Sequence, residues 1–495
     1  MLVQIVKGTP PWVWVILVGL IVLGAVQLRD REMSRPRLLA LPLVMVVLSL
    51  LATASAFELA PAALMGWALG GAVAVLVLRP SAAPVNMRTD GRYRVAGSWW
   101  PLLLILCIFS IRYVVSAVLV IDPSSRQLLP FQAAAGLLSG TFAGLFLGRA
   151  FAALGIGRGR GLIRWATAVA VLALLPLGVA LALVAWPLPA EETEQSKPSQ
   201  ELETFMRTAP RVAPGEALYF KARDGADRLY RRYDGSGPDV LVLFHGSTGD
   251  SRYLAWLSRR IAGQTGLTVV TPDMRGHGPA PGRRGDAGYV GQQEHDVADL
   301  LATLRDRSFK RVFLGGHSLG GGLAIRYAAG SQVPRPDGLI LLAPFVNQGS
   351  PAAFPGAGGW ATAFMPRFVG LSLLHRYGIS AFDHLAVLRF RTSPSSRDGS
   401  ETSLYSWRLW TSLAPRDAWR KEIASLACPV LVIGAAEDPF FRSEGYPEVF
   451  KLAAQAEVEI VPRLSHFHLV VDEGVPGRIA RWLQQAPARS AERGA

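Results

Sequence analysis

Residues 311–323 read Arg-Val-Phe-Leu-Gly-Gly-His-Ser-Leu-Gly-Gly-Gly-Leu. The apolar start of this stretch is typical of a buried strand, and its glycine-rich end opens a helical pattern. Between them, Gly316-His317-Ser318-Leu319-Gly320 fits the pattern G-x-S-x-G. In a tight strand-to-helix turn of this kind, small residues flank the serine and the turn lifts the hydroxyl above the sheet edge. The stretch therefore predicts that Ser318 is a nucleophile in a domain of alternating strands and helices.

The flanking sequence extends this alternation over residues 216–487. Val240–Phe244 is an apolar run bounded by Pro238-Asp239 and Gly246, which suits a buried parallel strand. Strands alternating with helices indicate a mostly parallel sheet with helices on both faces. The expected strands are 217–221, 228–233, 240–244, 268–271, 311–314, 339–342, 430–433 and 458–461, and the expected helices are 251–264, 291–307, 319–330, 417–425 and 476–485.

A catalytic serine needs a base, and the base needs an acid that orients it. In this architecture the chain order is serine, acid, histidine. Asp438 directly follows an expected strand, and Glu437 is its competitor. His466 and His468 both follow the last expected strand, and their spacing places both on the same side of an extended segment. The residues alone therefore leave two acids and two bases open.

An oxyanion hole needs two backbone N–H donors. Leu319, the residue after the nucleophile, supplies one, and Ser247 in the loop after the strand 240–244 is the expected second. In the same loop His245 is expected to be structural. A separate stretch, residues 272–278, is expected to form a shaped turn of the scaffold in which Asp273 and Arg275 are able to pair beneath the site. Because no residue cluster has metal-ligand spacing and no loop is built to cradle a phosphate, we expect neither a metal nor a cofactor.

Over residues 216–485 these motifs resemble the α/β-hydrolase families of monoacylglycerol lipases, lysophospholipases and serine aminopeptidases. In these families the acid commonly precedes a proline-containing turn, which favours Asp438 before Pro439. The distance onward to Arg481-Trp482-Leu483 fits the family pattern better with His466. The resemblance implies hydrolysis of an ester, thioester or amide without a cofactor, through Ser318, His466 and Asp438.

More than 80 residues separate the strands that end at Leu342 and begin at Val430, and most of them, residues 345–412, are expected to form a cap over the site. Its apolar content favours an acyl substrate, although such residues also pack a cap onto its domain. An aminopeptidase would need an acidic group for a free amine, for which Asp383 and Glu401 are available. The apolar side chains that could line an acyl pocket include Phe345, Phe354, Trp360, Phe364, Met365, Phe368, Leu371, Leu373, Leu374, Trp407 and Trp410.

The first 187 residues have a different composition, dominated by Leu, Val, Ala and Gly. Apolar stretches of nearly 20 residues or more predict a membrane domain of about six transmembrane helices. A polar, proline-marked linker is expected at 188–215 and a disordered tail at 488–495. The six stretches are 11–28, 38–57, 59–78, 101–120, 128–147 and 165–186.

Residues 1–155 resemble a family of small bacterial integral membrane proteins of unknown function. The resemblance rests on Thr9-Pro10-Pro11-Trp12-Val13-Trp14, on the run Arg37–Leu43, and on Gly97-Ser98-Trp99-Trp100-Pro101. It implies a module in the bacterial inner (plasma) membrane, with the lipid bilayer as a partner, but no activity.

The net charge of +14 is concentrated in three loops. Because these loops fall on one side of a six-helix bundle, the positive-inside rule places them in the cytoplasm and the hydrolase outside it. The same placement of arginines argues against a nucleic-acid partner. The three loops carry Arg29, Arg31, Arg35 and Arg37, then Arg79, Arg88, Arg92 and Arg94, then Arg149, Arg158, Arg160 and Arg164, whereas the other side carries only Lys7, Arg126 and Lys197.

Three functions fit these patterns. The first is a membrane-anchored serine esterase or lipase acting on a small-molecule or lipid ester. The second is an aminopeptidase. The third, from another class, is a non-catalytic membrane sensor or carrier whose hydrolase-like domain only binds a ligand.

Overall fold

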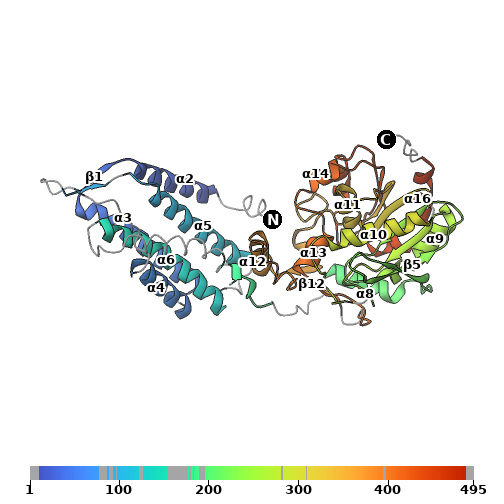
Figure 1. Ribbon diagram of the computed structural model, residues 1–495, viewed down its shortest axis with the longest axis horizontal. Helices are drawn as coiled ribbons and strands as arrows, with labels where there is room; N and C mark the ends of the chain where they lie inside the picture. Colours follow the sequence, from blue (N-terminus) through green and yellow to red (C-terminus); the bar gives the residue numbers. More distant parts are fainter. Residues whose placement is uncertain are drawn as a thin grey trace. The chain divides into compact units, whose positions relative to one another are not determined.

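The computed structural model describes residues 11–58, 60–76, 86–87, 93–95, 97–121, 126, 128–153, 177, 180–181, 183–188, 196–279, 282–307, 309–393 and 397–485. The chain divides into two compact units. The first consists of Met1–Leu188 and Pro366–Ile379, and the second of Pro189–Met365 and Ser380–Ala495 (Figure 1).

The first unit is built from apolar helices. They coincide with five of the six expected apolar stretches, whereas most of the sixth, 165–186, and the expected tail at 488–495 lie outside the described residues. Trp100–Leu119 and Pro130–Arg149 are long and apolar enough to cross a membrane, and three further apolar helices are shorter. The helices are α2 (Pro11–Ala25), α3 (Arg35–Ala56), α4 (Pro61–Leu76), α5 (Trp100–Ile121) and α6 (Leu129–Ala153).

Helices α4 and α6 approach each other closely because glycines line their contact. Gly66 and Gly70 on α4 lie against the α6 backbone at Ala133 and Leu137. Gly136, Gly140 and Gly144 on α6 lie against the α4 backbone at Ala63, Trp67 and Gly71. A methyl group at Gly140 would collide with the backbone of Trp67. Small residues spaced by four let two membrane helices pack backbone to backbone, where van der Waals contact stabilises them.

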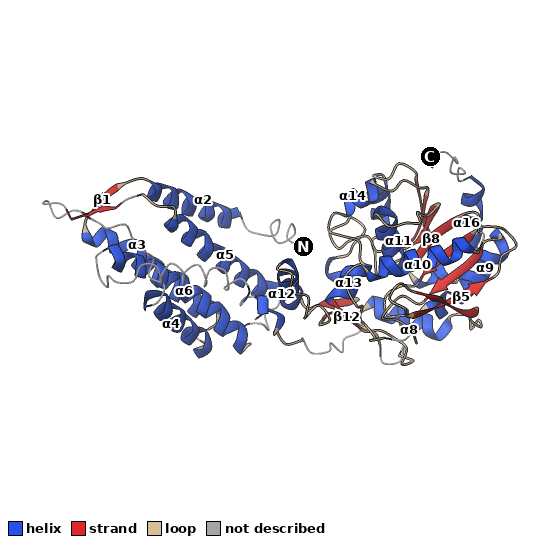
Figure 2. Ribbon diagram, viewed as in Figure 1, coloured by secondary structure: helices blue, strands red, loops and turns tan. Residues whose placement is uncertain are grey.

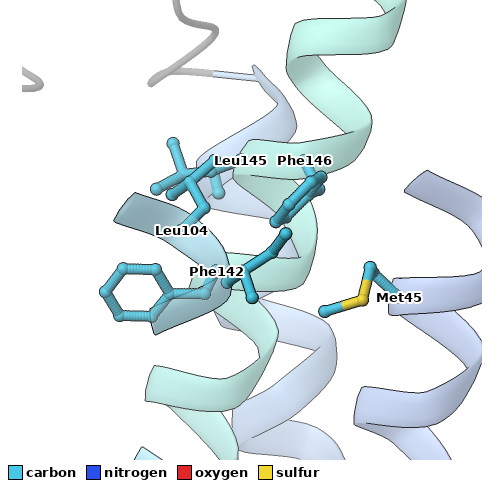
Figure 3. Packing of buried hydrophobic residues seen from close by; sticks show 7 residues of the cluster. Met45, Leu104, Phe142, Leu145 and Phe146 are labelled. Atoms are coloured by element: carbon cyan, nitrogen blue, oxygen red, sulfur yellow. The ribbon is translucent and has the colours of Figure 1, made fainter. Parts of the chain in front are cut away.

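Side chains from α3, α4, α5 and α6 form the core of the first unit. Met45, Leu104, Phe142, Leu145 and Phe146 are buried together (Figure 3). The outward faces of the helices are also apolar. Leu51, Met65 and Leu69, for example, are 60%, 71% and 60% exposed. A surface of this kind is unfavourable in water and suits contact with lipid.

The two ends of the first unit differ. At the end where α3 begins, β1 (Arg31–Met33), β3 (Tyr93–Val95) and β2 (Asn86–Met87) form a small antiparallel sheet. At the end where α3 finishes, Glu58 and Arg126 form an ion pair of 2.5 Å. Phe131 and Trp186 also meet near that second end, with ring centroids 4.5 Å apart and Phe57 beside them.

The second unit is organised around an eight-stranded sheet of order β14-β13-β9-β8-β6-β7-β5-β4. Only β5 runs against the others, so the expectation of a mostly parallel sheet is confirmed. Every residue of β6, β7, β8, β9 and β13 is buried. The strands are β4 (Glu216–Lys221), β5 (Asp227–Tyr233), β6 (Val240–Phe244), β7 (Thr268–Pro272), β8 (Val312–His317), β9 (Gly338–Leu342), β13 (Val430–Ala435) and β14 (Ala456–Val461).

The helices of this unit surround the sheet (Figure 2). Helix α9 packs on α16, and α11 packs on α10, α13 and α14. Their bounds are α9 (Ala255–Thr265), α10 (Gln292–Asp306), α11 (Leu319–Ala329), α13 (Trp407–Leu413), α14 (Trp419–Ala424), α15 (Tyr446–Phe450) and α16 (Gly474–Gln485).

Two segments differ from what the sequence suggested. The expected linker contains a helix, α8 (Lys197–Thr208), which begins at the N-cap residue Ser196. The expected cap forms a small antiparallel sheet of β10 (Ala361–Ala363), β11 (Ala386–Phe390) and β12 (Leu404–Ser406). Helix α12 (Met365–Arg376), which joins β10 to β11, belongs almost entirely to the first unit.

Candidate active site

The carboxyl ends of the parallel strands meet at one edge of the sheet, where ligands bind in open α/β folds. Ser318 directly follows β8, and the loop that holds Ser247 follows β6. Asp438 follows β13, and His466 follows β14. The four expected site residues from distant parts of the sequence are therefore brought to the same edge.

Ser318 lies in a strained turn. Its backbone has φ 58° and ψ −122°, a conformation that costs a non-glycine residue about 1–3 kcal/mol. A side chain at Gly316 or Gly320 would collide with neighbouring backbone, so both glycines of the motif are sterically required. The Ser318 N–H donates to Leu342 O at 2.9 Å, and the Phe345 N–H donates to Ser318 O at 2.9 Å. These two bonds hold the turn against the end of β9.

Asp438 and His466 form a buried pair. The His466 Nδ1–H donates to Asp438 Oδ2 at 2.7 Å, while Asp438 Oδ1 accepts the N–H groups of Phe440 and Phe441 at 2.7 and 3.0 Å. The Phe440 ring stacks on the imidazole at 4.3 Å. Because Nδ1 carries the proton, Nε2 is left free to accept one. No hydrogen bond joins Ser318 and His466, both of which are described, and such contacts often tighten only once substrate is bound.

The competing acid and base lie elsewhere. The Glu437 side chain is exposed, and its backbone N–H donates to Leu464 O at 2.9 Å. His468 is also exposed, and its Nδ1 lies 2.7 Å from Ser465 Oγ. The geometry thus pairs Asp438 with His466, whereas Glu437 and His468 are exposed and make other contacts.

The loop after β6 offers one expected oxyanion donor. The Gly246 N–H is occupied, because it donates to Tyr253 Oη at 2.5 Å. Within the described residues, the N–H groups of Ser247 and Leu319 donate to no protein acceptor. Trp360 of the cap donates its Nε1–H to Ser247 Oγ at 3.1 Å and so fixes the loop from above. Two N–H groups are therefore free for a developing oxyanion.

His317, which precedes the nucleophile at a variable position of the motif, links Tyr253 to the backbone of His466. Tyr253 Oη donates to His317 Nδ1 at 2.9 Å, and His317 Nε2–H donates to His466 O at 3.1 Å. Burial, and then the neighbouring His466, hold the pKa of His317 well below its usual value, so the ring is neutral. The pattern G-x-S-x-G gives no signal for this residue, because it accepts any residue at that position.

A second buried histidine pair supports the oxyanion loop. His245 Nε2 accepts the Met274 N–H at 3.0 Å, and its Nδ1–H donates to Gly246 O at 2.8 Å. Burial lowers its pKa. His277 Nε2 bonds the hydroxyl of Tyr405, which also accepts the Thr248 N–H at 3.2 Å. The ring nitrogens of His245 bond only backbone, which fits the structural role expected for it.

The expected pair of Asp273 and Arg275 does not form. Arg275 instead bonds Asp224 at 2.8 Å and Asp296 at 2.7 Å. Asp273 accepts the Ser251 N–H at 2.9 Å. The prediction was wrong because two carboxylates from distant parts of the chain reach the guanidinium.

Within the described parts of the chain, no group of three or more His, Cys, Asp or Glu side chains is placed to hold a metal ion. The reactive groups that the structure brings together at this edge of the sheet are the serine, the buried His–Asp pair and the free N–H groups.

Comparison with known families also distinguishes an amino-terminal from a carboxy-terminal part of the chain. Residues 237–473 match the family described as serine aminopeptidase, S33. Residues 1–182 match a family of unknown function, DUF6622. The first match covers β6 to η7 (Phe467–Val470) and includes every candidate site residue.

Two curated relatives and one solved structure are similar to this chain. The sn-1-specific diacylglycerol lipase ABHD11 of Xenopus tropicalis is 28% identical over 263 residues, 49% of this chain and 76% of its own. The lysophosphatidylserine lipase ABHD12 of Macaca fascicularis is 24% identical over 50% of this chain and 55% of its own. A solved monoglyceride lipase variant of Saccharomyces cerevisiae is 18% identical over 56% of this chain and 96% of its own, with a TM-score of 0.43. Residues 237–473 therefore form an α/β-hydrolase domain, and the chain is a serine hydrolase.

Proposed function

We propose that this chain is a membrane-embedded serine hydrolase that cleaves carboxylic esters of lipid-like acyl groups. Ser318 is the nucleophile, His466 the base and Asp438 the acid that orients it. The observation that carries the proposal is the buried 2.7 Å bond between His466 and Asp438, beside a serine held in a strained strand-to-helix turn.

The proposed reaction has two halves. Ser318 Oγ attacks the ester carbonyl carbon while its proton passes to His466 Nε2, and the N–H groups of Leu319 and Ser247 stabilise the oxyanion. Collapse of this intermediate breaks the ester bond, and the leaving alcohol takes the proton from His466. A water molecule then repeats the sequence on the acyl-enzyme, releasing the carboxylic acid and restoring Ser318. Asp438 remains ionised and stabilises the imidazolium in both halves.

The lipid-like substrate has two supports. The relatives named above include a diacylglycerol lipase and a lysophosphatidylserine lipase. Aromatic side chains also gather near the site: Trp360 packs on Phe440 at 5.1 Å, and Phe345 packs on Trp410 at 5.5 Å. Such walls suit an acyl chain.

The acids available for a peptidase are less suited to a free amine. Asp383 is only 3% exposed, and the Glu401 carboxylate accepts the Gly399 N–H at 2.8 Å. The environments of these two acids therefore favour an ester substrate over a peptide with a free amine.

The membrane part of the proposal is a bundle of about six spans with the hydrolase on the extracytoplasmic side. Two helices of spanning length and the exposed apolar faces of α3 and α4 support a bilayer environment. The concentration of arginines in alternate loops supports the orientation. This topology would place Ser318 outside the cytoplasm.

The decisive experiment replaces the nucleophile in the full-length protein in detergent. Ser318→Ala should abolish hydrolysis of p-nitrophenyl esters and labelling by a fluorophosphonate probe, because no other group can form the acyl-enzyme. Ser331→Ala, an exposed serine of the same domain, is the matched control and should leave both signals unchanged. Undiminished turnover by Ser318→Ala would refute the proposal. A wild-type protein that never labels would favour a non-catalytic sensor or carrier.

A further inference from the structure

Helix α8 precedes the family-matched residues 237–473, yet it contacts the loop that carries His466. Glu201 Oε1 accepts two hydrogen bonds from this loop. One comes from Ser465 Oγ at 2.5 Å and the other from the Phe467 N–H at 2.9 Å. Since Ser465 and Phe467 are the two neighbours of His466, a single carboxylate holds the chain on both sides of the candidate base.

The helix adds an apolar contact on the same face. Phe205 lies one turn after Glu201, a spacing that places both side chains together. Its ring stacks on Phe467 with centroids 5.0 Å apart, and it meets Tyr253 edge-on at 6.3 Å. Phe205 is buried, so the helix is docked by packing as well as by hydrogen bonds.

The loop is also held from the opposite side. His317 Nε2–H donates to His466 O, as described above. His466 itself has helical backbone angles, φ −50° and ψ −58°, at the start of η7. Its backbone is thus held by Glu201 through both neighbours and by His317 through its carbonyl, which leaves little freedom for the imidazole.

The second histidine belongs to the same network. Ser465 has one hydroxyl hydrogen, which goes to the Glu201 carboxylate, so Ser465 Oγ accepts a hydrogen from His468 Nδ1 at 2.7 Å. His468 is therefore linked to Glu201 through the hydroxyl of Ser465.

Among the described atoms, Glu201 Oε2 is buried without a hydrogen-bond partner. Leaving a carboxylate oxygen buried and unpaired is unfavourable for folding. Sequences keep such features where function requires them, and Oε1 is the atom that binds the base loop.

We propose that Glu201 is a positioning residue for hydrolysis: its carboxylate fixes the backbone around His466 so that Nε2 faces Ser318. The inference rests on the proposed function, in which His466 is the base. It extends the working hydrolase beyond the matched family region, because a helix that precedes this region in the chain contacts the loop of the proposed base.

The test compares Glu201→Ala with Glu201→Gln in the full-length protein, using p-nitrophenyl esters. Glu201→Ala should lower kcat roughly 10- to 100-fold with KM within about threefold, because misplacing a base harms chemistry more than binding. Glu201→Gln keeps an acceptor oxygen and should restore kcat to within about threefold of wild type. Glu448→Gln removes an exposed charge of the same domain and serves as the control, with kcat unchanged.

The outcomes separate the two proposals. Wild-type kcat in Glu201→Ala, a loss confined to KM, or a glutamine variant as slow as the alanine variant overturns the role of Glu201 while leaving Ser318 as nucleophile. Full activity of Ser318→Ala would instead overturn the proposed function itself. Should Glu201→Ala fail to fold, Ser465→Ala decides, because it removes one of the two bonds and keeps the helix. Its kcat should fall about threefold or more, and wild-type turnover would contradict the inference.

Discussion

At the scale of single residues, the proposed role of Asp438 as the acid leads to the sharpest prediction. Asp438→Asn should lower kcat by about 10³- to 10⁴-fold, because an amide in place of the carboxylate favours the wrong imidazole tautomer. Glu437→Gln should change kcat less than twofold, since Glu437 is exposed and does not contact His466. Steady-state ester hydrolysis at pH 7 measures both. Equal losses in the two variants would show that the acid has been misassigned.

The choice between His466 and His468 shows what the sequence could not resolve. On an extended segment, residues two apart share a side, so spacing gave both histidines the same direction. The segment is not extended: His466 has helical angles and η7 begins at the next residue. The two side chains therefore diverge, His466 toward Asp438 and His468 toward Ser465. This local turn directs only His466 toward Asp438, and the sequence pattern did not indicate the turn.

At the scale of elements, α8 was overlooked although the sequence contains its signals. Ser196 caps the helix, its side chain accepting from the Ser199 N–H at 3.4 Å, and Pro198 lies in the first turn. Proline is favoured there, yet the prolines of this region were interpreted only as marks of a linker. Leu202 and Phe205 supply a buried stripe. The helix is predictable from capping and periodicity, whereas its partner, the His466 loop, is not.

The contact of α4 with α6 makes a second prediction. Gly140→Leu should lower the thermal unfolding midpoint of the detergent-solubilised protein by several degrees, because a side chain there collides with the α4 backbone at Trp67. Gly19→Leu on α2 is the control, since nothing lies within 4 Å of its added Cβ. A fluorescence-detected unfolding assay compares the two variants. Identical midpoints would show that the close helix contact is not required.

At the scale of the whole molecule, the sheet could be predicted from the sequence. The assignment of α12, a part of the expected cap, to the first unit could not. Strands such as β6 and β13 are buried along their entire length, so their apolar runs stand out in the sequence. Helix α12 comes from the middle of the expected cap but packs in the first unit, where Arg367 donates to Val184 O and Trp186 O at 3.1 and 2.8 Å. Nothing in the cap sequence specifies that destination, because its partners lie almost 200 residues earlier.

The arrangement of the first unit supports the proposed topology independently of charge. Pairing of β1 with β3 brings the loops after the first and third apolar helices to one end, and these loops are rich in arginine. The Glu58–Arg126 ion pair joins the loops that follow the second and fourth apolar helices, and it lies at the other end. Trp186 packs on Phe131 near this second end. The chain therefore leaves the unit opposite the arginine-rich end, as an even number of spans requires.

This arrangement predicts the location of the hydrolase. Alkaline phosphatase fused after Ala495 should be active in a bacterial host, because the positive-inside rule keeps the arginine-rich loops in the cytoplasm and the hydrolase would then lie outside. A fusion after Arg160, within an arginine-rich loop, is the matched control and should be inactive. A green fluorescent protein fusion at each position reports the opposite compartment. Fluorescence at the carboxyl terminus together with an inactive phosphatase there would place Ser318 in the cytoplasm and require an odd number of spans.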